Sequence, residues 1–138
     1  MPGRGRGILI GVAGGTGAGK TLVAQSIAED LGHDKVLLLE QDSYYRDLVN
    51  IPLGEREIHN FDHPDAFDRE LLRQHVETLL NGGDIDMPVY DMRTHTRLPE
   101  PVRVKARPII ILDGLLILED PAIRQLMDIK LYVDADPD

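Results

Sequence analysis

The stretch Ile8-Leu-Ile-Gly-Val-Ala-Gly14-Gly-Thr-Gly-Ala-Gly19-Lys20-Thr21 joins an apolar run, a glycine-rich turn and the start of a second apolar pattern. The first run is apolar on both faces, which is typical of a central parallel strand. After the turn, apolar residues recur at helical spacing, and Gly32 supplies a stop for that helix. The members of this helical face are Val23, Ala24, Ile27, Ala28 and Leu31. The sequence therefore predicts a strand, a glycine turn and a helix in direct succession.

Further strands and helices alternate along the rest of the chain. Apolar runs predict strands over residues 36–39, 108–112 and 129–133, and helical spacing predicts a helix from Arg69 to Leu80. Asp120 followed by Pro121 is typical of the start of a short helix. The proline-containing segment 85–104 is predicted to be an irregular, hairpin-like excursion. This order predicts an α/β fold, with one parallel sheet covered by helices on both faces, in a single domain over residues 1–138.

Length and composition exclude several classes of protein. A chain of 138 residues is long enough for one domain with a real core. Its formal net charge of −9 disfavours a nucleic acid or an anionic membrane as the main partner. The absence of cysteine excludes disulfides and thiolate chemistry. The apolar stretches are too short to span a bilayer and the start has no signal-like apolar region, so we expect a soluble cytoplasmic protein.

The glycine turn matches the pattern G-x-x-x-x-G-K-[ST] in full. Its glycines allow successive backbone N–H groups to point into one concave nest, and the following helix adds its positive end. In this motif the lysine reaches the β- and γ-phosphates and the hydroxyl binds Mg²⁺. The preceding strand and the following helix favour this interpretation over a plain turn with a surface lysine. We therefore predict a nucleoside triphosphate site with Mg²⁺ at Gly14, Gly15, Thr16, Gly17, Ala18, Gly19, Lys20 and Thr21.

Two carboxylates follow predicted strands that end at the same edge of the sheet. Asp113 ends the run Ile109-Ile-Ile-Leu, a position that suits a magnesium ligand, although it could simply cap the turn before Gly114. Asp42 follows the second strand and could be directed at the γ-phosphate or cap a turn. The chain contains neither the N-K-x-D signature of GTPases nor the L-S-G-G-Q of transporter ATPases. A kinase with a pocket for a phosphoryl acceptor is therefore favoured.

Five blocks of sequence, in their order along the chain, resemble the phosphoribulokinase/uridine kinase family and, within it, the uridine kinases. They are the glycine-rich loop, the Gln-Asp-Ser-Tyr-Tyr at 41–45, the Asn-Phe-Asp-His-Pro-Asp-Ala-Phe-Asp at 60–68, the Pro-Val-Tyr-Asp at 88–91 with the segment after it, and the Ile-Leu-Asp-Gly-Leu-Leu at 111–116. The resemblance implies a P-loop kinase-like three-layer α/β/α sandwich. It also implies ATP-dependent phosphorylation of uridine and cytidine to the 5′-monophosphate in pyrimidine salvage.

The same resemblance implies a role for each residue of an acceptor site. Asp42 would be the general base for the nucleoside 5′-hydroxyl and, with Thr21 and Asp113, a magnesium ligand, while Lys20 would act on the phosphates. Asp62 would accept hydrogen bonds from the ribose 2′- and 3′-hydroxyls, although it could merely fix a turn. The base would be read by Tyr90 and His95, and apolar contact would come from Phe61 or Tyr45. His95 could instead be a solvated loop histidine.

The chain also departs from the family pattern. The family commonly has glutamate at the position of Asp113, and an arginine-rich lid with closing elements after the segment that matches residues 129–138. We therefore expect a C-terminally incomplete fold, weak activity by itself and a tendency to self-associate, with a homo-oligomer left open. The alternatives are a sister kinase of the phosphoribulokinase type and an ATP-binding module without turnover. The remaining aromatic residues Tyr44, Phe67 and Tyr132 are predicted to pack, and His33, His59 and His75 to be surface or helix residues.

Overall fold

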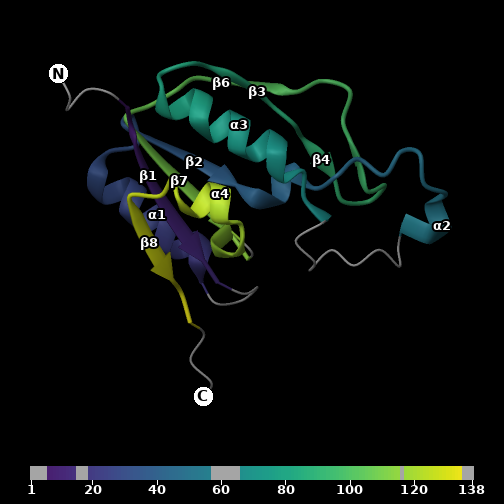
Figure 1. The fold of residues 1–138 in the computed structure, drawn as a ribbon, viewed down its shortest axis with the longest axis horizontal. Helices are drawn as coiled ribbons and strands as arrows, with labels where there is room; N and C mark the ends of the chain where they lie inside the picture. Colours follow the sequence, from purple (N-terminus) through teal and green to yellow (C-terminus); the bar gives the residue numbers. More distant parts are fainter. Residues whose placement is uncertain (1–5, 15–18, 57–65, 116, 135–138) are drawn as a thin grey trace.

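A four-stranded parallel sheet forms the centre of the computed structural model, which describes residues 6–14, 19–56, 66–115 and 117–134 (Figure 1). Its strands are β1 (Ile8–Ala13), β2 (Val36–Glu40), β7 (Ile109–Gly114) and β8 (Ile129–Tyr132). The spatial order is β2-β7-β1-β8, and each neighbouring pair is parallel. All four strands therefore end at one edge of the sheet, where ligands of such folds bind.

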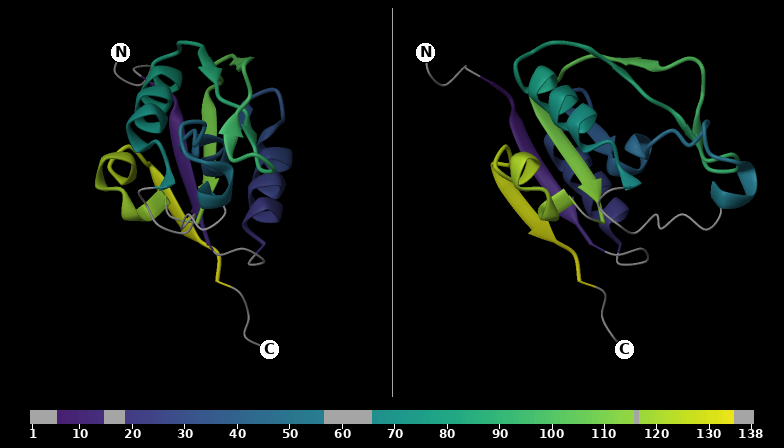
Figure 2. Two further views of the ribbon diagram at one scale, coloured as in Figure 1. Left: turned by 90° about the vertical axis from the view of Figure 1, so that its right-hand side faces the viewer. Right: turned by 45° about the vertical axis from the view of Figure 1, so that its right-hand side comes forward.

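Helices cover both faces of this sheet. Helix α1 (Lys20–Leu31) lies on one face, and α3 (Arg69–Leu80) with the short α4 (Pro121–Arg124) lies on the other, as the left view of Figure 2 shows. Alternate strand residues divide between two buried clusters, one under each helical layer. The first cluster contains Ile10, Val12, Ala24, Ala28, Val36 and Ile111, and the second includes Leu9, Leu39, Leu72, Val76, Ile110 and Leu112. The predicted α/β/α sandwich is confirmed.

The segment between α3 and β7 leaves the sheet and returns. Strand β3 (Ile85–Met87) pairs with β6 (Val102–Val104), and β4 (Tyr90–Asp91) pairs with β5 (Thr96–Arg97), both antiparallel. This excursion extends sideways from the sheet toward the short helix α2 (Leu53–Arg56), as Figure 1 shows. The predicted irregular hairpin is therefore confirmed, and it lies beside the turn that follows β2.

Local capping explains where helices α3 and α4 begin. The Asp68 carboxylate accepts a hydrogen bond from the Leu71 N–H at 3.2 Å and caps α3, and Asp120 caps α4 in the same way through the Ala122 N–H. Helix α3 has the predicted limits and α1 ends just before Gly32 as predicted, whereas β7 extends two residues past its predicted end, to Gly114. None of the helices in the described residues has the length and apolar character needed to cross a membrane.

Candidate active site at the carboxyl ends of the strands

The glycine turn begins where β1 ends and finishes at the start of α1. Gly14 is closely approached, because a Cβ atom there would lie 2.6 Å from the carbonyl oxygen of Val133. Gly19 has a left-handed backbone with φ of 88°, and no described side chain caps the N-terminus of α1. The first-turn N–H groups of α1 are therefore available to an anion. Residues Gly15, Thr16, Gly17 and Ala18 lie outside the described part of the chain.

Strand register brings carboxylates of β2 and β7 to the same face of the sheet. Glu40 is the register partner of Asp113, and Asp113 is in turn level with Val12 of β1. Paired residues of neighbouring strands project to the same side, and Val12 packs on the α1 side. The Asp113 carboxylate thus lies on the face where α1 begins with Lys20.

Burial and charge together change the acidity of Asp113, which is only 8% exposed. Burial, together with the negative charges of Glu40 and Asp42, raises the pKa of this carboxyl to about 6, against the opposing effect of the Lys20 ammonium. Each of these charges must lie near Asp113 to act on it. The structure therefore brings together Lys20, Asp42 and Asp113, three residues predicted for the site, and adds Glu40, which no sequence pattern marked.

The oxygen ligands at this edge fit a magnesium ion. Mg²⁺ prefers one or two protein oxygens and completes its shell with water and substrate phosphates. Asp113 and the hydroxyl of Thr21, which is exposed at the start of α1, offer such oxygens. In the described residues no three His, Cys, Asp or Glu side chains are close enough to form a preformed metal cluster. The oxygens present fit an ion that keeps water and phosphate oxygens among its ligands.

Asp113 should make the stability of the metal-free chain depend on pH. Because its folded pKa is about 6 and its ordinary value is 3.8, the folded state binds the proton more tightly. Its favourable contribution is complete below about pH 4 and disappears as pH rises through about 6. We expect Asp113→Asn to raise the free energy of unfolding at pH 7.5 by up to about 3 kcal/mol, and not at pH 4.

This effect is measured as the free energy of unfolding in urea, at several pH values, in buffer that contains a metal chelator. Asp30→Asn, at an exposed position of α1, is the matched control and should show no such gain. An Asp113→Asn variant with the wild-type pH profile would contradict the assignment.

Asp42 lies in a short 3₁₀ turn, η2 (Gln41–Tyr44), directly after β2. Gln41 and Tyr44 are buried and anchor the turn, while Asp42 is exposed. The anchoring is tight, because a Cβ atom on Gly114 would lie 2.5 Å from the Cβ of Gln41. The turn therefore has a fixed place against the end of β7, with the Asp42 carboxylate on its open side.

A cavity of about 320 Å³ opens beside Asp42, between η2 and the start of the excursion. Its lining includes Asp42, Ser43, Pro88, Tyr90 and the two methionines Met87 and Met92. This size lies within the usual range of small-molecule sites, which combine apolar walls with few polar groups. Tyr90 is thus placed beside Asp42, as an acceptor site requires.

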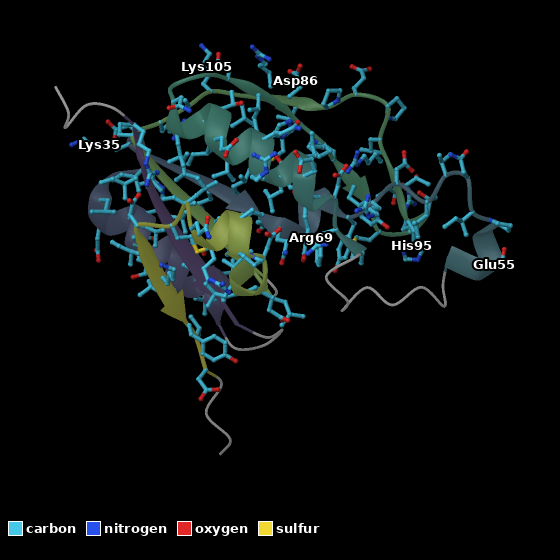
Figure 3. All side chains as sticks on the ribbon, in the orientation of Figure 1. Lys35, Glu55, Arg69, Asp86, His95 and Lys105 are labelled. Atoms are coloured by element: carbon cyan, nitrogen blue, oxygen red, sulfur yellow. The ribbon has the colours of Figure 1, made fainter. Side chains whose placement is uncertain are left out.

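His95 occupies the turn of the β4–β5 hairpin, far from the sheet (Figure 3). Its backbone is left-handed with φ of 58°, which is uncommon for a residue with a side chain. Two backbone hydrogen bonds hold it, from its own N–H to the Asp91 carbonyl at 2.8 Å and from the Leu48 N–H to its carbonyl at 3.0 Å. These two hydrogen bonds hold the left-handed backbone conformation and so fix the position from which the imidazole side chain extends.

An aromatic stack lies under Tyr90. Tyr45 is buried and stacks on Phe67 with ring centroids 4.5 Å apart, and its ring lies 5.2 Å from that of Tyr90. Tyr45 therefore lies within reach of the predicted base site, although little of it is exposed. Phe61 and Asp62 lie outside the described residues, so their roles stay predictions.

The structure also contains contacts that sequence patterns missed. His75 lies in α3, in line with the expectation of a surface or helix residue, and its Nδ1 also shares a partly buried hydrogen bond with the Tyr44 hydroxyl at 2.7 Å. Burial raises the pKa of Tyr44 and lowers the pKa of His75. The prediction that Tyr132 packs is wrong, since 68% of it is exposed on the outer strand β8, whereas Phe67 does pack.

The parallel sheet, the glycine loop before α1 and the carboxylates at the strand ends define a kinase fold of the P-loop class. Solved structures support this. A possible uridine kinase from Bacillus stearothermophilus superposes with a TM-score of 0.68 at 19% identity, over 91% of this chain and 70% of that one. Phosphoribulokinase from Rhodobacter spheroides superposes with a TM-score of 0.62 at 17% identity, over 91% of this chain and 50% of that one.

The chain belongs to the phosphoribulokinase / uridine kinase family, which its sequence matches over residues 9–138. It is 50% identical to a uridine kinase of Brevibacillus brevis over 134 residues, 97% of this chain and 63% of that protein. Identity to a uridine kinase of Halalkalibacterium halodurans is 52% over 133 residues, 96% of this chain and 63% of that protein. This chain therefore spans about 63% of the length of these relatives.

Proposed function

We propose that this chain binds ATP and a pyrimidine nucleoside and transfers the γ-phosphoryl group to the 5′-hydroxyl of uridine or cytidine. The observation that carries the proposal is the identity of about half, over nearly the whole chain, to proteins named uridine kinase. The cavity beside Asp42 supports it, because it offers the acceptor a place next to the nucleotide site. The proposed setting is pyrimidine salvage in the cytoplasm, with a small nucleoside as the partner.

The phosphates of ATP would be bound by backbone N–H groups of the glycine turn, by the N-terminus of α1 and by Lys20. Asp113 and Thr21, with Asp42 nearby, are the residues that would hold Mg²⁺. When bound, the ion would neutralise charge on the phosphoryl oxygens. Lys20 would contribute a positive charge at the same place. Together these groups would favour the transition state, because most catalysis of phosphoryl transfer is positioning and electrostatic stabilisation.

Asp42 would act on the acceptor. As the 5′-oxygen bonds to the γ-phosphorus, the bond between that phosphorus and the ADP oxygen breaks, and the hydroxyl proton passes to the Asp42 carboxylate. The exposed side chain of Asp42 at the cavity suits this role. Tyr90 and His95 would contact the pyrimidine edge, Tyr45 and Phe61 would add apolar contact, and Asp62 would bind the ribose hydroxyls.

The test is release of ADP from ATP with Mg²⁺ in the presence of uridine, cytidine, ribulose 5-phosphate or no acceptor. We expect uridine and cytidine to raise ADP release and to yield their 5′-monophosphates. The matched control is 5′-deoxyuridine, which lacks the attacking hydroxyl and should bind without turnover. Stimulation by ribulose 5-phosphate alone would favour the sister kinase. ATP binding with no product from any acceptor would favour a nucleotide-binding module.

A further inference from the structure

We propose that Asp68 is a positioning residue that fixes the β4–β5 hairpin relative to the η2 turn. The hairpin carries Tyr90 and His95, and η2 carries Asp42. The inference rests on the proposed function and deepens it, because it names a residue that sets where the nucleoside base lies relative to the general base. No sequence pattern gives Asp68 this role.

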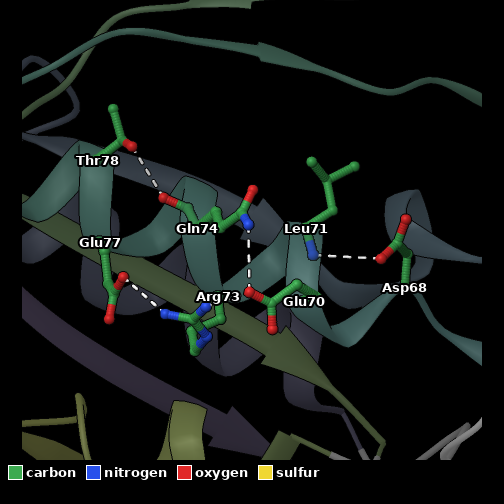
Figure 4. A network of polar contacts seen from close by, with 7 residues as sticks. All are labelled: Asp68, Glu70, Leu71, Arg73, Gln74, Glu77 and Thr78. Atoms are coloured by element: carbon green, nitrogen blue, oxygen red, sulfur yellow. Dashed lines mark hydrogen bonds and ion pairs between the residues drawn. The ribbon is translucent and has the colours of Figure 1, made fainter.

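Asp68 makes polar contacts in three directions. One carboxylate oxygen, Oδ1, caps α3 through the Leu71 N–H at 3.2 Å (Figure 4). The backbone N–H of Asp68 donates to the carbonyl of Tyr44, the last residue of η2, at 2.7 Å. The second oxygen, Oδ2, accepts a hydrogen bond from the guanidinium of Arg97 at 3.3 Å. A single residue thus connects α3, η2 and β5.

The contact with Arg97 is both charged and shielded. The side chains of Arg97 and Asp68 are 24% and 28% exposed, so water screens the pair less than it screens a surface salt bridge. Arg97 is also the register partner of Tyr90 in the hairpin. A shift of the Arg97 backbone would therefore move Tyr90 with it, away from or toward the cavity beside Asp42.

Neighbouring contacts join η2 and α3 into one unit. The partly buried hydrogen bond between Tyr44 and His75 connects the end of η2 to the middle of α3. The hairpin is connected to this unit by the Asp68 carboxylate and, farther out, by the Leu48 N–H that bonds the His95 carbonyl. Removing the charge on Asp68 should therefore loosen the hairpin without disturbing the glycine turn or α1.

The substitution Asp68→Asn separates the two functions of the carboxylate, which are to cap α3 and to pair with Arg97. Asparagine caps helices as well as aspartate does, so α3 keeps its cap while the ion pair with Arg97 is lost. Asp120→Asn is the matched control, because Asp120 caps α4 through the Ala122 N–H and makes no ion pair with an arginine in the described residues. Hydrogen exchange of the full chain and titration with uridine and with ATP are the measurements.

We expect exchange of the hairpin N–H groups of His95 and Leu98 to accelerate in Asp68→Asn, with the β1 and β7 amides unchanged. Uridine should bind about 10-fold more weakly, the lower end of the scale for loss of one hydrogen bond to a charged group, while ATP affinity stays the same. Arg97→Met should have a similar effect, and the double variant should be little worse than either single one.

Three results would overturn the proposal. The first is unchanged exchange in the hairpin, the second is a loosened hairpin with unchanged uridine affinity, and the third is equal loss of uridine and ATP affinity, which would indicate general destabilisation. A wild-type chain that binds ATP and no nucleoside contradicts the proposed function instead. In that case the exchange measurement alone still decides whether Asp68 holds the hairpin.

Discussion

Asp42→Asn should reduce phosphoryl transfer to uridine by about 10²–10⁴-fold, the usual contribution of a general base. Asparagine has nearly the same shape and keeps a polar side chain at the cavity, but it cannot accept the proton of the 5′-hydroxyl. Binding of ATP and of uridine should therefore change little, and the loss should appear in kcat rather than in KM. Steady-state ADP release with both substrates varied measures the two constants.

Asp47→Asn is the matched control for this substitution. Asp47 lies five residues further along the same loop, is exposed, and accepts a hydrogen bond from the Val49 N–H at 3.1 Å, a contact that asparagine can keep. Its variant should have wild-type activity. If Asp42→Asn retained more than about a tenth of the wild-type kcat, the assignment of Asp42 as the base would be wrong.

The fold could be predicted where local sequence decides the structure. Helix α3 begins at Arg69 because Asp68 caps it, and it ends at Leu80 before an Asn-Gly-Gly turn, so both limits were visible. The pairing of β3 with β6 was not visible, since three-residue strands separated by a long excursion leave no periodic signal. The exposure of Tyr132 could not be predicted from the pattern of apolar residues either, because it depends on which strands are neighbours in space.

The candidate site likewise contains residues that the sequence could place and residues that it could not. The glycine motif, Asp42 and Asp113 are short patterns that follow strands, so the sequence could place them at one edge of the sheet. Glu40 enters the site only through its register with Asp113. The contacts between Tyr44 and His75 and between Asp68 and Arg97 join segments about thirty residues apart, and no local rule connects such residues. The sequence thus marked the groups that we propose for the reaction and missed the contacts that we propose to position them.

Lys20→Met should lower phosphoryl transfer by about 10²–10³-fold and weaken ATP binding, the cost expected when one fixed electrostatic contact to the phosphoryl group is removed. Methionine keeps an unbranched side chain of similar length and a good helix propensity, so α1 should still form. The structure adds a second consequence, because the Lys20 charge also lowers the pKa of Asp113.

Without that charge the pKa of Asp113 should rise further above its ordinary value, and more of this carboxyl should be protonated near neutral pH. A protonated carboxyl is a poor ligand for Mg²⁺, so the variant should need a higher pH than wild type to bind Mg²⁺ with ATP. Titration with Mg²⁺ and ATP between about pH 7 and 9 separates the two effects, since the phosphates of ATP are ionised over this range and direct loss of the phosphate contact then changes little with pH. Lys35→Met, at an exposed lysine just before β2, is the control and should leave both the affinity and its pH dependence unchanged. A Lys20→Met variant with weaker ATP binding and an unshifted pH dependence would show that Lys20 contacts phosphate without tuning Asp113, and unchanged ATP binding would remove Lys20 from the site.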